Sequence, residues 1–483
     1  MKNQSNISFV LDDKIVTIDF LQDKKFKPTN SVLEYLRSLR TKKGIKEGCG
    51  QGDCGACTIV LGEINDKNEI SYKAVNSCLL LLPMIHEKQI ITIENLASKK
   101  DNEVILHPVQ QAIVDTNSSQ CGYCTPGMAM SIFGLFKNHK NPSREIIEDA
   151  LIGNICRCTG YQPLIKAAQN SCKGQYDDFE KNINHTIDLL RKIKKENNTI
   201  SIKTEDVYYF RSKSFSEILQ IRKENSDAIL LSGGTDSTQK KLSGKPKPLK
   251  IIDLSGVEDL KYFTEDDKNF YISSGIDIEK LRTYAISKLP VLDNILKVFS
   301  SLQIRNLATI GGNIGVASPI GDLIPVLFAL KAKVKLQSSS EKRIIEIENF
   351  IKSYRKTDIK EDEIIESVII PKSDKNIIRS YKISKRRNLD ISTLSATFNL
   401  LLDDNLIVKD IILAFGGMAE ITKRARKTED FLLKKTWERK SVIEAIEILK
   451  DEFNPISDAR ADKEFRKIAA GNLLLKFWSE TNE

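Results

Sequence analysis

The spacing of apolar and polar residues in the N-terminal part predicts a small mixed domain. Residues 10–20 and 58–62 form short apolar runs typical of strands. Residues 31–40 carry apolar residues at helical spacing, and Ser31 or Asn30 precedes them as a helix cap. We therefore expect a sheet with one covering helix.

The pattern changes three times further along the chain. Thr125-Pro126 predicts a cap followed by proline at the first helical position, leading into helices over 128–137 and, from Ser143, 143–151. Residues 173–205 are rich in Lys, Asn and Asp, with 188–195 as the one helix-like stretch, which predicts a linker. Short strands such as 228–231 and 250–254 then alternate with helical segments, which indicates a second α+β region.

Composition places the chain among multidomain globular proteins. With 483 residues it is too long for a single core, and at roughly 150 residues per domain it predicts about three domains. Apolar residues make up 41% and charged residues 29%, a globular balance. The longest apolar stretches, such as 78–85, are far shorter than the ~20 residues that span a membrane, and residues 1–8 lack the apolar segment of a signal peptide. We expect a cytoplasmic protein.

Charge gives little indication of a partner. The net charge is +9, but the 74 basic and 65 acidic residues are interspersed. Neither a nucleic-acid partner nor a membrane partner is expected.

All nine cysteines lie in the first 172 residues, and the first four have a distinctive spacing. Cys49, Cys54 and Cys57 follow the pattern C-x4-C-x2-C, and twenty further residues separate Cys57 from Cys78. This is the ligand spacing of plant-type 2Fe-2S ferredoxins. The four glycines at 48, 50, 52 and 55 suit a backbone that wraps closely around a cluster. A four-cysteine zinc loop is the alternative.

A second group consists of Cys121 and Cys124, followed by Cys156 and Cys158. Both pairs fall at the ends of predicted helices, where thiolates are electrostatically favoured. We expect a second site with four sulfur ligands, again with zinc as the alternative. The chain has four histidines, none near a cysteine pair, which disfavours mixed Cys/His zinc sites, and Cys172 is predicted to be a spare thiol.

Two glycine-containing turns are candidates for flavin binding, although the G-x-G-x-x-G dinucleotide fingerprint is absent. Residues 232–236, Ser-Gly-Gly-Thr-Asp, follow the strand at 228–231, so their backbone N–H groups could hold a pyrophosphate. A plain strand-to-helix turn is the alternative. Residues 305–313 and 318–322 gather small and hydrogen-bonding residues where a phosphate and a flavin ring require close backbone approach.

The motifs KEGCGQGDCGACTIVLG (46–62), HPVQ with SQCGYCTPG (within 107–127) and GNICRCTGYQP (153–163) resemble those of the molybdenum hydroxylases typified by xanthine dehydrogenase. The resemblance implies that Cys49, Cys54, Cys57 and Cys78 bind one 2Fe-2S cluster. It implies that the second group binds another cluster close to the molybdopterin cofactor, and that Gln120 contacts the pterin. The ligands of this second cluster would be Cys121, Cys124, Cys156 and Cys158.

The flavin turns resemble the FAD domain of the same family, which has a vanillyl-alcohol-oxidase-type fold. The resemblance implies a set of FAD-binding residues: Leu230, Leu231, Ser232, Gly233, Gly234, Thr235, Asp236, Ser237, Phe299, Thr309, Ile310, Gly311, Gly312, Asn313, Asp322, Ile365 and Lys382. Phe299 is expected beside the flavin ring, with a purely structural core role as the alternative. The basic run around Lys382 (381–387) could instead be a solvated face.

The resemblance runs nearly end to end and implies an α+β multidomain fold. The expected parts are a plant-type ferredoxin-like domain (1–95), a helical-bundle 2Fe-2S domain (96–172), the linker (173–205), an FAD-binding domain (206–375) and a C-terminal α+β flavoprotein domain (376–483). The large molybdenum-binding region of the family has no counterpart in the sequence, so molybdopterin is expected on a separate large subunit, in a heterotetramer of two small and two large chains.

The implied activity is that of the electron-transfer subunit of a xanthine dehydrogenase. Electrons would pass from the molybdenum subunit through both clusters to FAD and then to NAD+, in the oxidation of hypoxanthine or xanthine. The equivalent subunit of an aldehyde or N-heterocycle hydroxylase is one alternative, and a zinc-binding interaction protein is another.

Overall fold

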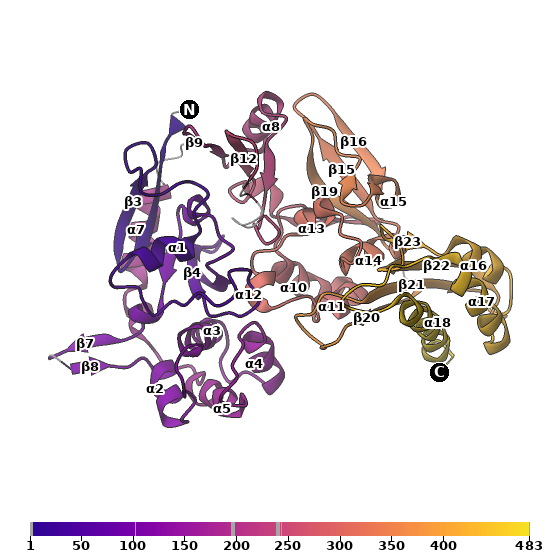
Figure 1. Ribbon diagram of the computed structural model, residues 1–483, viewed down its shortest axis with the longest axis horizontal. Helices are drawn as coiled ribbons and strands as arrows, with labels where there is room; N and C mark the ends of the chain where they lie inside the picture. Colours follow the sequence, from indigo (N-terminus) through magenta and orange to yellow (C-terminus); the bar gives the residue numbers. More distant parts are fainter. Residues whose placement is uncertain are drawn as a thin grey trace. The chain divides into compact units, whose positions relative to one another are not determined.

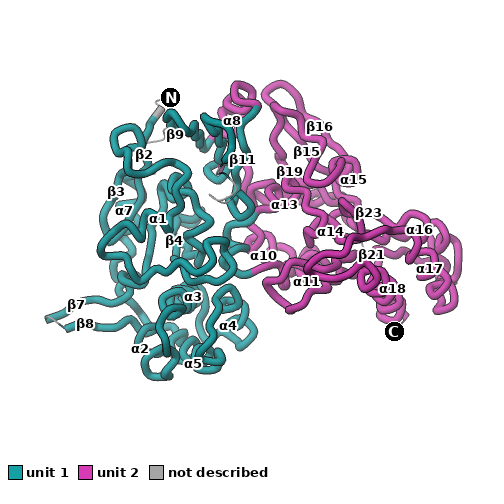
Figure 2. Tube along the Cα trace, in the orientation of Figure 1, with its two compact units in different colours: residues 1–213, 227–256, 301–308 teal, residues 214–226, 257–300, 309–483 magenta. Residues whose placement is uncertain are grey.

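The computed structural model of the protein describes residues 3–101, 103–194, 199–237, 242, 244–373 and 375–482. The chain forms two compact units, coloured separately in Figure 2. Unit 1 comprises residues 1–213, 227–256 and 301–308, and unit 2 comprises residues 214–226, 257–300 and 309–483. The chain therefore passes from one unit to the other several times.

The first sheet of unit 1 is the one that the N-terminal pattern predicts. Its strand order is β3-β2-β6-β4-β5, and α1 contributes to the same apolar core. These elements are β2 (Asn6–Leu11), β3 (Lys14–Asp19), β4 (Thr58–Ile64), β5 (Ile70–Asn76), β6 (Gln89–Ile91) and α1 (Val32–Ser38). Ser31 caps α1 as expected, since its hydroxyl accepts from the Glu34 N–H while the Glu34 carboxylate accepts from the Ser31 N–H.

The prediction of one strand over residues 10–20 is wrong. This stretch crosses the turn of the antiparallel β2–β3 hairpin, in which Val10 pairs with Ile15. Asp12 and Asp13 form the turn with φ values of 52° and 57°. Two consecutive residues in the left-handed region give a tight hairpin turn, and aspartate tolerates that conformation.

The second sheet of unit 1 has the order β1-β9-β10-β12-β11. Its strands are β1 (Asn3–Gln4), β9 (Thr199–Lys203), β10 (Val207–Arg211), β11 (Ile229–Leu231) and β12 (Leu249–Asp253). The strands predicted at 228–231 and 250–254 are thus present. Strands β10, β12 and β11 are parallel, and Arg211, Asp253 and Leu231 align at their carboxyl ends. Ligands of α/β sheets bind at such an edge.

Helices make up much of the rest of unit 1. In Figure 1, α2, α4 and α5 lie beside α3, which also packs on β4 and β5, and the β7–β8 hairpin precedes α2. The elements are β7 (Ser98–Lys100), β8 (Glu103–Ile105), α2 (Pro108–Asp115), α3 (Thr125–Asn138), α4 (Arg144–Leu151), α5 (Gln162–Ser171), α6 (Asp178–Lys181) and α7 (Ile183–Lys194).

The segment 173–205, predicted as a linker, is largely structured. It contains α6, α7 and β9. Leu189, Leu190 and Ile193 of α7 are buried in the helical core, and α7 packs on β2. The helix-like stretch at 188–195 is the second half of α7, although residue 195 lies outside the described residues. High polarity concealed the first half of this helix, because only one of its faces is apolar.

The buried His86, just before β6, should make the stability of the fold sensitive to acid. Its ring is buried, and Nδ1 accepts a hydrogen bond of 3.0 Å from the Ser8 N–H. Burial, together with the positive charges of Arg211 and Lys213, lowers its pKa from 6.5 to about 3. Unfolded His86 takes up a proton below about pH 6.5 while folded His86 does not, so stability is full above that pH and falls as pH decreases toward 3.

Urea unfolding should reveal this dependence. Between about pH 8 and about pH 5, the wild type should lose about 2 kcal/mol more stability than His86→Asn, whose amide oxygen keeps the Ser8 hydrogen bond without titrating. Equal losses in both proteins would show that His86 is not the group responsible.

Unit 2 holds two larger antiparallel sheets. One has the order β13-β14-β19-β15-β16 and the other β20-β21-β22-β23. The strands are β13 (Phe263–Glu265), β14 (Asn269–Ser273), β15 (Lys333–Gln337), β16 (Lys342–Glu346), β19 (Ile364–Pro371), β20 (Ile377–Ile383), β21 (Leu394–Leu402), β22 (Val408–Gly416) and β23 (Lys423–Arg424), with β17 (Ile351–Ser353) and β18 (Lys356–Thr357) as a separate pair.

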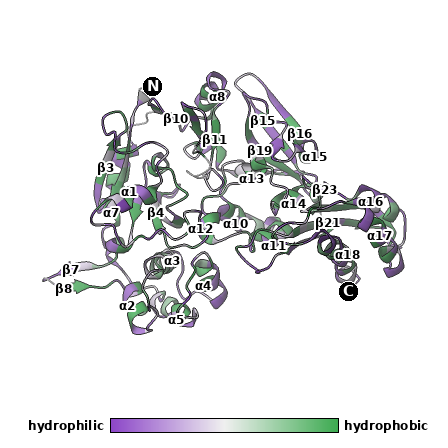
Figure 3. Ribbon diagram, in the orientation of Figure 1, coloured by the Kyte–Doolittle hydropathy of each residue, from purple (hydrophilic) through white to green (hydrophobic). Residues whose placement is uncertain are grey.

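Helices make up much of the rest of unit 2. They are α8 (Phe215–Glu224), α10 (Ile278–Lys288), α11 (Pro290–Leu296), α13 (Ile310–Val316), α14 (Leu323–Ala329), α15 (Ile347–Phe350), α16 (Arg426–Leu432), α17 (Arg439–Glu452) and α18 (Lys463–Glu480). Every residue of α14 is buried, and Figure 3 colours it hydrophobic. The longer α18 is mixed in hydropathy, and within the described residues we find no helix with the length and apolar character to cross a bilayer.

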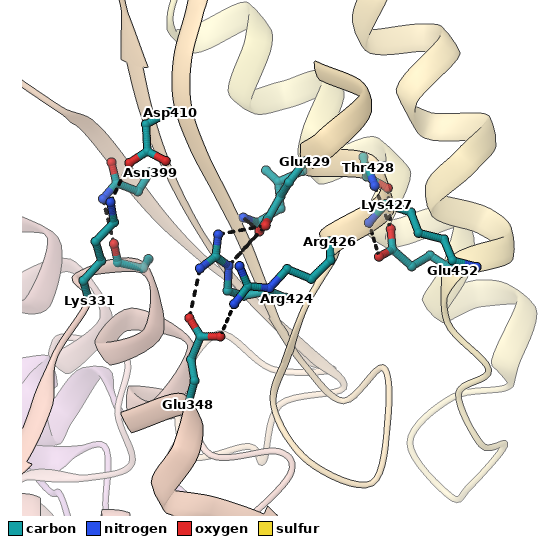
Figure 4. A network of polar contacts seen from close by, with 12 residues as sticks. Lys331, Glu348, Asn399, Asp410, Arg424, Arg426, Lys427, Thr428, Glu429 and Glu452 are labelled. Atoms are coloured by element: carbon teal, nitrogen blue, oxygen red, sulfur yellow. Dashed lines mark hydrogen bonds and ion pairs between the residues drawn. The ribbon is translucent and has the colours of Figure 1, made fainter. Parts of the chain in front are cut away.

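An ion-pair network joins the two sheet regions of unit 2 (Figure 4). Glu348 of α15 binds Arg424 at 3.0 Å and Arg426 at 2.5 Å. Arg424 also binds the buried Glu429 at 2.8 Å, and Glu429 accepts from the Leu413 N–H. The network therefore fixes α15 to the β22–β23 edge.

Candidate iron–sulfur and flavin sites

The first four predicted sulfur ligands come together around the loop before β4. The Sγ atoms of Cys57 and Cys78 are 3.3 Å apart. Cys49 Sγ accepts backbone hydrogen bonds of 3.3 Å from Gln51 and from Asp53. Such N–H donors stabilise negative charge on sulfur, as a cluster ligand requires.

The same thiols are arranged as two pairs. A hydrogen bond from the Cys54 thiol lowers the pKa of Cys49 to about 5, and one from Cys78 lowers the pKa of the buried Cys57. Each pair thus stabilises a thiolate. In the described part of the chain, no three Cys, His, Asp or Glu side chains lie close enough to share one metal ion. A 2Fe-2S cluster would take two cysteine sulfurs on each of its two iron atoms. The two thiol pairs therefore fit this group.

The second four predicted ligands also pair, Cys124 with Cys156 and Cys121 with Cys158. Cys124 itself is the N-cap of α3, and Thr125 is the first helical residue. The prediction that Thr125 caps this helix is therefore wrong by one residue. Pro126 is tolerated at the second position because the first turn of a helix leaves its N–H groups unpaired. Cys121 and Cys158 are exposed, so this site reaches the surface of unit 1.

Thr159 is a functional candidate that the sequence reasoning missed. Its hydroxyl donates to Cys156 Sγ at 3.2 Å, and the Cys158 N–H donates to the same sulfur at 3.4 Å. Burial raises the pKa of Cys156, but hydrogen bonds from the Thr159 hydroxyl, from the backbone N–H groups of Cys158 and Thr159, and from the Cys124 thiol together outweigh it and lower the pKa to about 7. A donor of this kind stabilises a reduced cluster, which carries the greater negative charge.

Thr159→Val should therefore lower the reduction potential of the second cluster. Loss of one hydrogen bond worth about 1 kcal/mol corresponds to roughly 40 mV for a one-electron couple. Potentiometric EPR titration measures the shift. Thr125→Val is the matched control, because the Thr125 hydroxyl pairs with Ser119 instead; equal shifts in both variants would contradict the assignment.

The two predicted cluster loops are in direct contact within unit 1. The Ile155 N–H donates to the Cys54 carbonyl at 3.0 Å, and the Tyr123 hydroxyl donates to the Glu47 carbonyl. Gly55 has a φ of +68°, and a Cβ there would lie 2.3 Å from the Gly153 carbonyl oxygen. Glycine is therefore required for this approach.

Two further predicted residues lie beside these loops. Gln120 is exposed and directly precedes Cys121, so it is available to a partner, and its pterin role stays a prediction. Cys172 is fully buried, and burial raises its pKa to about 11. Its Sγ lies 3.9 Å from the Ser171 hydroxyl, which agrees with a structural thiol.

The predicted pyrophosphate turn, residues 230–237, lies at the carboxyl end of β11 in unit 1. A Cβ on Gly233 would lie 1.7 Å from the Leu307 carbonyl oxygen, so the turn depends on glycine at this position. A Cβ on Gly234 would lie 3.0 Å from the carbonyl oxygen of Leu79, the residue after Cys78. The turn thus adjoins the fourth predicted ligand of the first cluster.

The other predicted FAD residues belong to unit 2. Thr309 caps α13, and the four N–H groups of residues 310–313 all have protein acceptors: Ile276 O, Ser274 O, Thr309 Oγ1 and Thr309 O. The backbone N–H groups at the start of α13 are therefore paired within the protein. The buried Asn313 Oδ1, however, has no hydrogen-bond partner, and it fits a donor on a bound ligand.

Asp322 and Lys382, predicted separately, form one buried ion pair of 2.8 Å. Asp322 also accepts a 2.5 Å hydrogen bond from Ser392, and Lys382 also donates to the Val298 carbonyl, directly before Phe299. The pair therefore holds the backbone beside the predicted flavin-facing aromatic. Ile365 is buried in β19.

The sequence reasoning also missed three polar residues that are buried near the cluster loops. Asn154, Ser131 and Gln303 hydrogen-bond to one another and are all nearly inaccessible to solvent. The position of Asn154 two residues before Cys156 was the available signal in the sequence. Nothing in the sequence pattern connects Gln303 with it.

Four family models match the chain in succession. They are described as a 2Fe-2S iron-sulfur cluster binding domain (residues 21–82), a 2Fe-2S binding domain (92–169), an FAD binding domain in molybdopterin dehydrogenase (186–373) and a CO dehydrogenase flavoprotein C-terminal domain (379–481). These matches confirm the predicted α+β multidomain fold and its two iron–sulfur domains, and they support iron–sulfur sites over zinc sites.

Individual relatives are similar to most of the chain. The chain is 31% identical over 490 residues to a xanthine dehydrogenase of Calliphora vicina, covering 87% of this chain and 36% of the relative. It is 30% identical over 525 residues to a xanthine dehydrogenase/oxidase of Mus musculus, covering 98% of this chain and 38% of that one. The chain thus spans a little over a third of the length of these relatives.

Solved structures share the fold of part of the chain. A Cu,Mo-CO dehydrogenase in its cyanide-inactivated form has a TM-score of 0.52 and 21% identity, with 57% of this chain and 97% of that chain covered. Quinoline 2-oxidoreductase from Pseudomonas putida 86 has a TM-score of 0.52 and 20% identity, with 58% and 96% covered.

Proposed function

Because the chain belongs to the molybdenum hydroxylase family, as an iron–sulfur and FAD electron-transfer component, we propose that it is the corresponding subunit of a xanthine dehydrogenase. It passes electrons from a molybdenum-bearing partner subunit to FAD and then to NAD+. Cys49, Cys54, Cys57 and Cys78 hold one cluster, and the second cysteine group holds the other.

The observation that carries this proposal is the succession of contacts inside unit 1. The second cysteine group adjoins the first through the Ile155–Cys54 hydrogen bond, and the first adjoins the flavin turn where Gly234 approaches Leu79. The exposed Cys121 and Cys158 face outward at the start of this succession, where a partner can reach them. When bound, the clusters would supply one-electron transfer. FAD would link these one-electron steps to the two-electron transfer of a hydride.

The protein residues contribute position and charge. Backbone and hydroxyl donors hold negative charge on Cys49 and Cys156, and the Asp322–Lys382 pair orders the backbone beside Phe299. Asn313 offers a buried acceptor to the flavin. Gln120, beside Cys121, contacts the partner's pterin in this proposal.

The xanthine assignment rests on the xanthine dehydrogenases among the relatives. The second candidate, a hydroxylase of aldehydes or N-heterocycles, is favoured by the likeness in fold to quinoline 2-oxidoreductase. The two candidates differ only in the partner subunit, so the choice requires that subunit.

Two measurements test the proposal. The purified chain should contain about four iron atoms with matching acid-labile sulfide and about one FAD, and it should reduce artificial acceptors with NADH while oxidising no purine. Stoichiometric zinc without sulfide would overturn it. Reconstitution with the co-purifying molybdenum subunit should give NAD+-dependent xanthine turnover; oxidation of an aldehyde or quinoline alone would move the assignment to the second candidate.

A further inference from the structure

A short segment of unit 1 reaches the contact between the two cluster loops from far along the sequence. Helix α12 (Leu302–Arg305) carries Gln303, whose side chain is inaccessible to solvent. Gln303 Nε2 lies 2.9 Å from Ser131 Oγ, 3.0 Å from Asn154 Oδ1 and 3.1 Å from the Ala150 carbonyl oxygen. All these partners lie between residues 131 and 154, in the helical region of unit 1.

These contacts determine how the Asn154 amide is oriented. Its Oδ1 accepts from Gln303 and from the Ser131 hydroxyl, the latter at 2.6 Å. Its Nδ2 therefore points the other way, 3.0 Å from the Gly55 carbonyl oxygen and 3.3 Å from Thr58 Oγ1. A reversed amide would place its N–H groups against the Gln303 Nε2 donor and its oxygen against the Gly55 carbonyl oxygen, so these two contacts allow only one orientation.

Each end of this chain of hydrogen bonds is attached to a predicted cluster ligand. Asn154 precedes Cys156 by two residues, and Ser131 belongs to the helix that Cys124 caps. Gly55 directly follows Cys54. The Gln303–Asn154 pair therefore bridges the ligand loops of both clusters, where the backbones are already too close for any Cβ at Gly55.

We propose that Gln303 is a positioning residue that, through Asn154, sets the separation of the two clusters and thereby the rate of electron transfer between them. This inference rests on the proposed cluster ligands. Electron transfer between fixed centres depends steeply on distance, so a buried polar link between the two loops has a direct effect on the rate.

The test replaces Gln303 by methionine, which keeps the length of the side chain but donates no hydrogen bond. Asn306→Ala is the matched control: Asn306 ends the same helix and donates at 2.9 Å to the Ala74 carbonyl on β5, and not to the 131–154 segment that Gln303 binds. The readouts are the low-temperature EPR splitting that arises from magnetic interaction between the reduced clusters, and the freeze-quench rate of electron transfer between them.

Gln303→Met should retain both cluster signals, change their splitting and slow the transfer severalfold, while Asn306→Ala should leave both readouts at wild-type values. Wild-type splitting and rate in Gln303→Met would overturn the inference. If that variant does not fold, Ser131→Ala removes the other donor to Asn154 Oδ1 and is judged by the same readouts. A wild-type chain without two clusters would instead overturn the proposed function.

Discussion

Cys124→Ala is expected to abolish the EPR signal of one reduced 2Fe-2S cluster and to leave the other signal in place. Cys124 pairs with Cys156 in the second site, whereas Cys49, Cys54, Cys57 and Cys78 form a separate set. Alanine offers no atom to replace the thiolate, so three sulfurs remain where a 2Fe-2S cluster requires four ligands. Substrate-driven reduction of FAD in the reconstituted complex should be lost as well.

Cys172→Ala is the control for this experiment. Cys172 is as buried as any predicted ligand, but its Sγ lies beside the Ser171 hydroxyl and belongs to none of the four cysteine pairs. Both signals should survive in this variant. Loss of both signals in Cys124→Ala, with circular dichroism unchanged, would mean that the eight cysteines are divided wrongly between the clusters.

Asp322→Ala should strongly destabilise the flavin region of unit 2. The side chains of Asp322 and Lys382 are only 8% and 5% exposed, so the substitution leaves a buried ammonium without its carboxylate. Breaking a buried pair on one side costs about 3–5 kcal/mol. Because Lys382 also holds the Val298 carbonyl beside Phe299, we expect FAD to be lost together with stability. Urea unfolding and the flavin absorbance after gel filtration measure the two effects.

Two variants control for the Asp322 experiment. The double substitution Asp322→Ala with Lys382→Met removes both charges and should recover much of the stability, since replacing both partners is far less costly than removing one. Asp390→Ala breaks the more exposed pair with Arg386 and should cost less than about 1 kcal/mol. A loss in Asp322→Ala no greater than in Asp390→Ala would contradict the argument.

Local motifs account for most of what the sequence predicted correctly. The C-x4-C-x2-C loop, the Ser31 and Ser143 caps and the turn after β11 all depend on residues close together in the chain. Errors arose where local patterns were ambiguous. No glycine or proline marks the Asp12-Asp13 turn, so it was included in one predicted strand. The first half of α7 was missed because the helix is largely polar.

The remainder of the site depends on contacts that no local pattern encodes. Gln303 is 149 residues from Asn154, and Lys382 is 60 residues from Asp322. The sequence identified Asp322 and Lys382 individually by resemblance, but their pairing, and the complete pairing of the N–H groups at 310–313, come only from the tertiary fold.

Residues 301–308 belong to unit 1, although the sequence on either side of them belongs to unit 2. This limits where the chain can be cut into separate fragments. A fragment ending at residue 172 would keep all eight predicted sulfur ligands but would lose Gln303, Arg305 and Asn306. Ser131 and Asn154 would lose their amide donor, and Asp149 would lose its 2.7 Å arginine partner. Such a ferredoxin-like fragment should bind iron less tightly and resist proteolysis less well than the same residues in the intact chain. Gene fission at the end of the cysteine-containing region would thus separate the redox centres from part of their own scaffold.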